Sequence, residues 1–368
     1  MRSRFIGSAV FILVALAVTA GCGNPEAKKT KFYGKGMALY EKADYVKAGL
    51  EFKNALQIDP NFVDAYYMLG QVSLKQGDVR NAFGYFSKAT ALSPGHIQAN
   101  LLLGKILLAA HHPEKAVENV NRVLEKQPRN EEALILKAGV FIADKKEDEA
   151  RRILEGLLGR GCRKPELYLM MAGIFQEKND KAQVEQTLKQ GAAANPESVE
   201  ILLSLASIYA NSGRTPDAEA ALKRVVSLRP KDNRNKMNLA VLYWETGRKD
   251  TAVQTLNAML QVAPADEDAW NSVAAFYISK KMSDEAEKAL KEGVTKNPRS
   301  SRLRIALNEL YIAQGKTDKA MAVLNEYLAL DDDPKSTGNI HAKNSLALCY
   351  LLRGDTDRAQ KYVDDALR

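Results

Sequence analysis

The sequence predicts an all-α fold, an α-solenoid of helix–turn–helix units that follow one another along the chain. Nine segments of 34 residues run head to tail and carry small residues at the same places. One column holds Ala48, Ala82, Ala116, Ala150, Ala218, Ala252, Ala286, Ala320 and, after a short insertion, Ala359. Proline closes many units, at Pro60, Pro94, Pro128, Pro196, Pro230, Pro264 and Pro298. A fixed period of this length is the signature of a solenoid repeat.

The first half of the unit that begins at Val63 has the pattern of an amphipathic helix. Apolar or small residues have the i, i+3, i+4, i+7 spacing of one helical face, at Tyr66, Leu69, Gly70 and Ser73. Gly77 is expected to end this helix, because glycine adopts the left-handed backbone conformation at a helix C-terminus without a Cβ clash.

The second half of the same unit predicts another amphipathic helix, with Ala82, Phe86 and Ala89 on its buried side. Pro94 ends it, because proline lacks an N–H and clashes with a preceding helical turn. Each unit is therefore expected to read helix, turn, helix, turn.

A second column of small residues runs through the first helices, at Gly36, Gly70, Gly104, Ala138, Ala172, Ala206, Ala240, Ala274 and Ala347. Antiparallel helices packed about 8–10 Å apart need little bulk where they cross, so the two small columns are expected to meet there. Larger residues are expected to fill the space to the neighbouring unit, at Phe52, Phe86, Leu154, Leu188, Leu222, Leu256, Leu290 and Leu324.

These positions resemble the tetratricopeptide repeat (TPR), and the resemblance extends from Lys29 to Arg368. The family's unit reads aromatic, Leu-Gly, Tyr, Ala, an aromatic or Leu, Ala and Pro. Clear matches are Tyr66-Leu69-Gly70, Leu205-Ala206-Tyr209, Leu239-Ala240-Tyr243 and Trp270-Ala274-Tyr277. The resemblance implies a right-handed α-solenoid of about ten units that offers a surface to protein partners.

The family pattern is broken locally. Cys162 replaces the closing proline of the fourth unit, Val184 the second-helix alanine of the fifth, and Asn308 the small residue of the ninth. We expect the stack to bend or loosen around Cys162 and at an insertion over 335–339. The predicted domain is thus nine units over 29–334, the insertion, and a tenth unit over 340–368. We expect either that this last unit docks a partner or that the chain continues beyond Arg368.

The N-terminal residues differ in kind from the repeats. Arg2 and Arg4 precede an apolar or small stretch from Phe5 to Ala20, which is too short for a lasting membrane span and is typical of a secretory signal. The following Val18-Thr19-Ala20-Gly21-Cys22 resembles a bacterial lipobox, with Thr19 where leucine is usual. The resemblance implies a signal peptide over 1–21, a lipid-modified Cys22 and a short linker over 22–28. The alternative is an ordinary secretory signal in which Cys22 is incidental.

The resemblance to a lipoprotein also implies a location. Gly23 follows Cys22, where an aspartate is the usual signal for retention in the inner membrane. Attachment to the periplasmic face of the outer membrane is therefore expected, with several acyl chains providing a stable anchor. Cys162 and Cys349 lie in the fourth and tenth units and are interpreted as unpaired small apolar residues.

Composition and motifs do not indicate catalysis. The 53 Lys and Arg against 45 Asp and Glu make the chain mildly basic, without the basic and aromatic tract of a nucleic-acid binder. Gly315-Lys316-Thr317 lacks the leading glycine of a phosphate loop, because Leu310 stands there. His111-His112 precedes Pro113 in a turn without matching ligands nearby. We predict no catalytic residue, metal ion or cofactor.

In the TPR family the first helix of every unit lines a concave face. Large or apolar residues at these positions are the predicted partner-binding residues, Tyr33, Tyr40, Tyr67, Leu74, Leu101, Leu108, Met237, Trp244 and Ile278. Contiguous exposed apolar area marks interaction sites, and aromatic residues dominate binding energy, so we expect a groove for an apolar or amphipathic segment of a protein. The alternative is that neighbouring helices cover most of this surface.

The leading functional hypothesis is a lipid-anchored periplasmic scaffold for an envelope complex. The residues after the anchor, Asn-Pro-Glu-Ala-Lys-Lys, and the long run of units resemble TPR lipoproteins associated with exopolysaccharide export and exosortase (PEP-CTERM) systems. One alternative is a pilotin-like helper for type IV pilus secretins or outer-membrane protein assembly. Another is a module that binds glycan or peptidoglycan.

Overall fold

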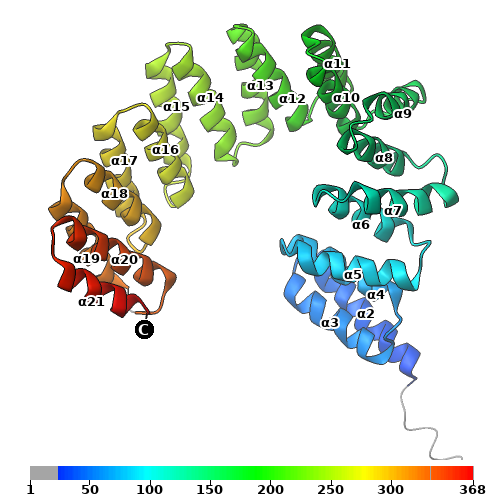
Figure 1. Ribbon diagram of the computed structural model, residues 1–368, viewed down its shortest axis with the longest axis horizontal. Coiled ribbons are helices and arrows are strands. Elements are labelled where there is room, and N and C mark those ends of the chain that lie inside the picture. Colours follow the sequence, from blue (N-terminus) through cyan, green and yellow to red (C-terminus); the bar gives the residue numbers. More distant parts are fainter. Residues whose placement is uncertain (1–23, 332, 368) are drawn as a thin grey trace, which may run out of the picture. The chain divides into compact units, whose positions relative to one another are not determined.

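The computed structural model describes residues 24–331 and 333–367, and these residues form helices joined by short turns (Figure 1). No strand occurs among them. The chain divides into two compact units, one up to Pro196 and one from Glu197. The predicted signal peptide, Cys22 and the start of the linker lie outside the described residues.

The first unit consists of helix pairs. Their first helices are α2 (Pro25–Glu41), α4 (Val63–Lys75), α6 (Ile97–Ala109), α8 (Glu131–Ala143) and α10 (Pro165–Glu177). Their second helices are α3 (Tyr45–Ile58), α5 (Val79–Leu92), α7 (Pro113–Lys126), α9 (Glu147–Gly159) and α11 (Lys181–Ala194). The two helices of a pair pack against each other, and the second helix also packs on the first helix of the next pair.

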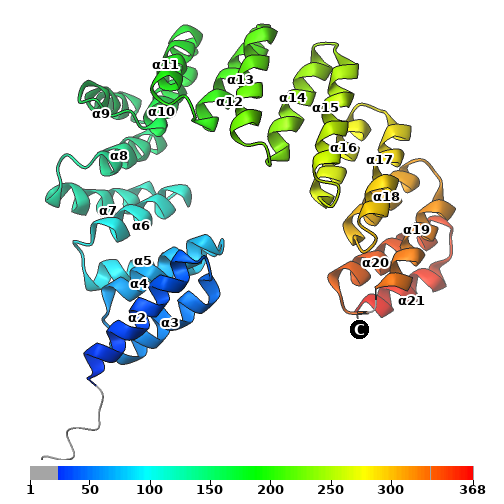
Figure 2. The same cartoon turned by 180° about the vertical axis from the view of Figure 1, so that it is seen from behind.

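The second unit repeats this arrangement, and Figure 2 shows the same order of pairs from behind. Its first helices are α12 (Val199–Asn211), α14 (Asn233–Glu245), α16 (Glu267–Ser279), α18 (Ser301–Ala313) and α20 (Thr337–Leu352). Its second helices are α13 (Thr215–Leu228), α15 (Lys249–Val262), α17 (Ser283–Lys296), α19 (Thr317–Leu330) and α21 (Thr356–Leu367). The predicted all-α solenoid fold is confirmed.

A left-handed residue occupies the turn inside each described pair. These residues are Ala43, Gly77, His111, Lys145, Asn179, Gly213, Gly247, Lys281, Gly315 and Gly354. At Gly77, φ is +77°, and the N–H of Asp78 donates to the carbonyl of Ser73 across 2.8 Å, which satisfies one of the last carbonyls of α4. The predicted helix end at Gly77 is confirmed, and His111 proves to be a turn residue of the same kind.

Two glycines of the first-helix column make room for aromatic rings of their own pair. A Cβ on Gly70 would lie 2.4 Å from the Phe86 ring, and one on Gly36 would lie 2.5 Å from the Phe52 ring. Where the column holds alanine, the ring position holds leucine, as in the pair Ala138 and Leu154. The large residues therefore pack on the crossing helix of their own pair, besides filling the space to the next pair.

Two segments differ from what the sequence predicted, the insertion over 335–339 and the linker over 22–28. Thr337–Asn339, from the insertion, form the first turn of α20, because the Ser336 hydroxyl accepts from the N–H of Asn339 across 3.0 Å and caps the helix. Helix α20 still packs on both α18 and α19, so the insertion lengthens a helix and leaves the stack intact. Part of the expected linker over 22–28 is helical, because α2 already begins at Pro25 behind the cap Asn24.

The two predicted unpaired cysteines are buried and free in the described chain. Cys349 of α20 faces Asn308 of α18, whose Nδ2 lies 3.5 Å from the cysteine sulfur. Asn308 thus fills the small-residue position of its pair while its amide contacts the next first helix. Its side chain is 1% exposed, so this position remains part of the core.

A glutamate of one pair binds a tyrosine of the next pair in the second unit. Glu219 of α13 accepts from the hydroxyl of Tyr243 across 2.9 Å and from Arg248 Nη1 across 2.7 Å. Lys223 Nζ lies 2.8 Å from the same carboxylate. Hydrogen bonds from Lys223 and then Arg248 lower the pKa of Glu219 to about 2. We call this arrangement the tyrosine–glutamate latch.

The same latch recurs two repeats later. Glu287 of α17 accepts from the hydroxyl of Tyr311 across 3.0 Å, and Lys291 Nζ lies 2.6 Å from the carboxylate. Lys316 takes the place of the arginine, with its Nζ 3.7 Å from Glu287. The hydrogen bond from Lys291 leads the causes that lower the pKa of Glu287. The latch therefore joins consecutive pairs by a half-buried, charge-assisted contact.

The helix crossing can be tested at Gly70. We expect Gly70→Ala to lower the free energy of unfolding by about 1–3 kcal/mol, because the new methyl overlaps the Phe86 ring. Adding Phe86→Leu should recover most of the loss, because it recreates the pairing of Ala138 with Leu154. Urea unfolding followed by circular dichroism measures both values.

The matched control is Gly84→Ala in α5, where a Cβ would meet no atom within 4 Å. This change should stabilise the protein by up to about 1 kcal/mol through helix propensity. Equal stability of Gly70→Ala and the wild type would contradict the packing described at the crossing.

The latch predicts a pH-dependent stability. Because the folded-state pKa of Glu219 lies at about 2, below its ordinary value of 4.5, ionised Glu219 stabilises the fold above pH 4.5 and loses this effect as pH falls towards 2. We expect Glu219→Gln to lower the free energy of unfolding by about 1–3 kcal/mol at pH 7 and by less at pH 3. Urea titrations at both pH values measure the difference. Glu177→Gln, at an exposed position of α10, is the control, and a pH-independent loss in Glu219→Gln would exclude the latch as its cause.

Candidate functional site

A groove of about 690 Å³ runs across the first helices α6, α8 and α10 of the first unit. Its apolar lining comes from Leu108, Ile135, Leu136, Gly139, Leu169 and Met170. Charged side chains stand at its edge, and among them Lys105 of α6 forms an ion pair with Glu132 of α8. We call this surface the apolar groove.

A glycine keeps the apolar groove open. Gly139 lies on α8 between the side chains of Leu108 and Met170, which come from the flanking first helices. A Cβ at Gly139 would lie 3.0 Å from Leu108 Cδ2 and 3.3 Å from Met170 Cε. Any larger side chain there would fill the floor, so the groove depends on the absence of a side chain at this position.

A second groove, of about 920 Å³, lies along α12, α14 and α16 in the second unit. Charged and amide side chains supply much of its lining, and some of them contact one another. Arg234 Nη2 lies 2.7 Å from Asp232 Oδ2, and Asn233 Nδ2 donates to Asp266 across 2.7 Å. Leu203 and Met237 supply apolar contacts on its wall. We call this surface the polar groove.

The predicted partner-binding residues do not all line one groove. Leu108 lies in the apolar groove and Met237 in the polar groove. Ile278 is exposed on α16 but lines neither groove. Trp244 is half-buried, with its ring edge-on to Phe276 at a centroid distance of 5.5 Å, so much of its surface is used in packing.

The predicted aromatic residues of the first unit are also half-buried, because their rings pack on neighbouring aromatic residues. The ring-centroid distances are 5.5 Å from Tyr33 to Phe52, 5.4 Å from Tyr40 to Tyr45 and 6.0 Å from Tyr67 to Phe86. Leu74 likewise packs against the core of its pair. These side chains leave only part of their surface for a partner.

The prediction that Leu101 faces a groove is wrong. Its side chain is fully buried, at 0% exposure. Val120 and Val123 of α7 and Ala133 of α8 enclose it in one apolar cluster. The second helix of its own pair and the first helix of the next pair therefore cover it. Ile135 and Leu169 occupy the same register one and two repeats later and do line the apolar groove.

The structure also adds residues that apolar periodicity does not select. Ile135 and Leu169 follow from the 34-residue register, but Gly139 and Met170 line the groove from other positions. The polar groove includes Asn235, which is 4% exposed at a register that holds alanine, leucine or isoleucine in the other repeats except the first, where Lys31 stands. Only comparison of each repeat with the others reveals such an exception.

We also searched the described part of the chain for metal sites and membrane-spanning helices. Over 24–331 and 333–367, no three His, Cys, Asp or Glu side chains gather as a metal site requires. In those same ranges, no helix combines the length and the hydropathy needed to cross a bilayer. What the two grooves provide is contact surface, apolar in one and hydrogen-bonding in the other.

Comparison with solved structures finds similar repeat proteins of low identity. A tetratricopeptide repeat protein from Parabacteroides merdae is 16% identical, over 78% of this chain and 99% of that one, with a TM-score of 0.45. PilF of Pseudomonas aeruginosa is 17% identical, over 61% and 99%, with a TM-score of 0.46. PilW, a type IV pilus biogenesis factor, is 15% identical, over 58% and 97%, with a TM-score of 0.49. At this similarity, no function is transferred from them.

Sequence families give a firmer result. No curated protein matches this chain. The tetratricopeptide repeat family model matches residues 73–140, 107–174, 176–236, 212–276 and 277–337. A second model, described as TPR repeat, matches residues 36–77. Since these matches cover more than half of the sequence, the chain belongs to the tetratricopeptide repeat family.

Proposed function

We propose that this protein is a lipid-anchored scaffold on the periplasmic face of the outer membrane, where it holds protein components of an exopolysaccharide export assembly. Tetratricopeptide repeats generally bind protein partners, and the fold typically serves as a non-enzymatic scaffold. The observation that carries the proposed location is the apolar leader that ends in Val18-Thr19-Ala20-Gly21-Cys22 directly before the repeats. An anchored array of this kind would hold its partners close to the membrane surface.

The apolar groove is the proposed partner site. Ile135, Leu169 and Met170 line it from two adjacent first helices, while lysine and glutamate side chains stand at its edge. An amphipathic helix or an extended segment would place its apolar side chains on this floor and its polar side chains at the charged edge. Binding energy in such grooves is concentrated in a few well-packed apolar contacts.

The groove can be tested by charge insertion. We expect the double variant Ile135→Glu, Leu169→Glu to lose at least about tenfold of its partner capture, because two buried charges would oppose an apolar partner segment. Capture is measured by crosslinking in the native cells, pull-down and mass spectrometry. Circular dichroism checks that the helical content is retained.

Val46→Glu is the matched control, because Val46 is 67% exposed on α3 in the same unit and lies outside the groove. Undiminished capture by the double variant would exclude the apolar groove as the partner site. Recovery of polysaccharide synthases or export channels supports the export role, whereas recovery of secretins or barrel-assembly components would favour the assembly-helper alternative.

The anchor has its own test. We expect the wild type to incorporate radiolabelled palmitate and to fractionate with the outer membrane, and Cys22→Ala to lose the label and leave the membrane fraction. Cys349→Ala is the control, because Cys349 lies buried in the last pair and should not affect the label. A labelled Cys22→Ala variant, or an unlabelled wild type, would contradict lipid attachment at Cys22.

A further inference from the structure

The tyrosine–glutamate latch is missing at two repeats of the second unit, where Val253 of α15 and Met321 of α19 replace the glutamate. At the second of them, the tyrosine, Tyr350, hydrogen-bonds with Arg358 instead. Val253 stands in α15 at the register of Glu219 and Glu287, 34 residues after the first and before the second. Both cations of the latch are replaced here as well. Asn257 stands at the register of Lys223, and Met282 stands at the register of Arg248. The glutamate and both of its cations are therefore exchanged together.

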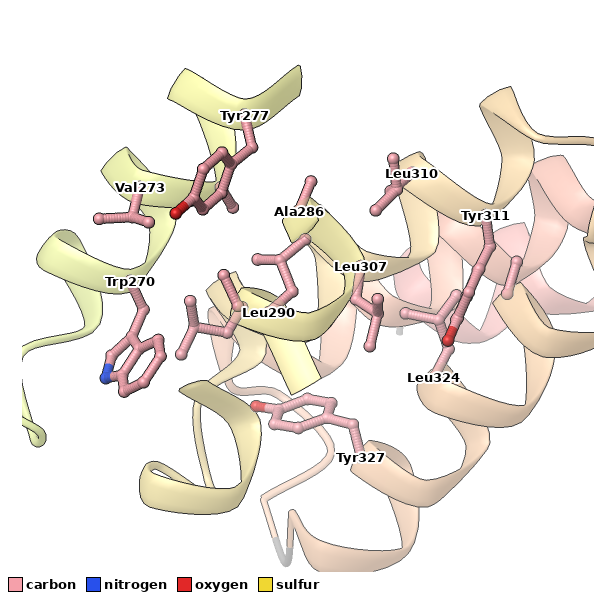
Figure 3. Packing of buried hydrophobic residues seen from close by; sticks show 14 of the residues in the cluster. Trp270, Val273, Tyr277, Ala286, Leu290, Leu307, Leu310, Tyr311, Leu324 and Tyr327 are labelled. Atoms are coloured by element: carbon pink, nitrogen blue, oxygen red, sulfur yellow. The ribbon is translucent and has the colours of Figure 1, made fainter. Parts of the chain in front are cut away.

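Tyr277 of α16 is the tyrosine at the repeat of Val253. Its side chain is 4% exposed, and within the described chain its hydroxyl has no hydrogen-bond partner. In Figure 3 the hydroxyl lies on the side of α16 that carries Val273 and Trp270. The hydroxyl is not among the fully enclosed polar atoms of the described chain, so this donor is accessible to a ligand.

A groove of about 580 Å³ adjoins this hydroxyl, between α15, α16 and α17. We call it the α15–α17 groove. Its volume lies within the range of small-molecule sites. Leu260, Trp270 and Val273 line its apolar part. The Trp270 N–H already donates to the carbonyl of Pro264 across 2.9 Å, so Trp270 contributes apolar surface to the groove.

The polar lining favours an uncharged ligand. Asn257 and Gln261 of α15 offer neutral amides, which can donate and accept at the same time. The cations of the intact latches are absent here, and the charged lining is balanced, with Glu285 and Glu292 facing the groove alongside Lys288 and Lys296. Burial, and then the charge of Glu285, raise the pKa of Tyr277, which keeps the hydroxyl protonated as a donor.

We propose that the α15–α17 groove binds an uncharged sugar, with one sugar hydroxyl accepting from Tyr277 and others exchanging hydrogen bonds with Asn257 and Gln261. The apolar C–H face of the ring would lie on Leu260, Val253 and the edge of Trp270. Each sugar hydroxyl both donates and accepts at a single oxygen, and a sugar ring carries several of them, which matches the paired donor and acceptor groups of the two amides. This site lies on other helices than the apolar groove and does not depend on the proposed scaffold role.

The test uses the purified full chain and three neutral disaccharides, N,N′-diacetylchitobiose, maltose and lactose. We expect saturation-transfer NMR to detect at least one of them and calorimetry to give its dissociation constant. Tyr277→Phe should weaken that binding about tenfold, because it removes one hydrogen-bond donor and keeps the ring. The double variant Val253→Glu, Asn257→Lys should abolish binding and raise Tm, because it rebuilds the latch over Tyr277.

Tyr311→Phe is the matched control. Its hydroxyl is already bound by Glu287 outside the groove, so this variant should lose stability and keep sugar binding. Failure of all three disaccharides to bind the folded wild type would overturn the proposal, as would unchanged binding by Tyr277→Phe. Binding of an N-acetylated alanine dipeptide amide, with the disaccharides silent, would overturn the sugar assignment and indicate a peptide site.

Discussion

The close crossing of the two helices in each pair is the contact on which the rest of this fold depends. It needs a small residue on the first helix opposite a large one on the second, and the two vary together, as in Gly70 with Phe86 and Ala138 with Leu154. In these pairs a larger residue on one helix is matched by a smaller one on the other, so the two helices can keep a similar spacing. Because each pair packs only on its neighbours, a disturbed crossing affects the grooves built from adjacent first helices.

Periodicity was sufficient to predict the fold class and the helix pairs, because each pair repeats the same packing problem. It could not predict the course of irregular segments. The turn register is fixed even where no glycine marks it, so His111 and Lys145 take the left-handed conformation that Gly77 takes elsewhere. At the insertion, one local contact, the Ser336 cap, decided that the chain would extend α20. Such contacts follow from three-dimensional geometry and leave little signal in the repeat pattern.

The candidate site, too, could be predicted from the sequence only in part. The register indicates which residues point away from the second helices, but not which of them neighbouring helices will cover. Leu101 and Ile135 share a register, yet α7 and α8 enclose the first while the second lines the apolar groove. Gly139 leaves space there for a floor between Leu108 and Met170. Exposure depends on small differences in packing between successive pairs, which a sequence read one repeat at a time does not contain.

Exceptions to the repeat are therefore more informative about function than the repeat itself. Val253, Asn257 and Met282 are unremarkable residues at separated positions, and they acquire meaning because the fold gathers their counterparts around one tyrosine hydroxyl. Without the latch, the two pairs lack a stabilising contact, and an accessible hydroxyl donor lies beside an open groove. In a stack held by nearest-neighbour contacts, such a loss stays local. A binding site can thus arise where a repeat gives up its own latch, with the crossings on either side preserving the architecture.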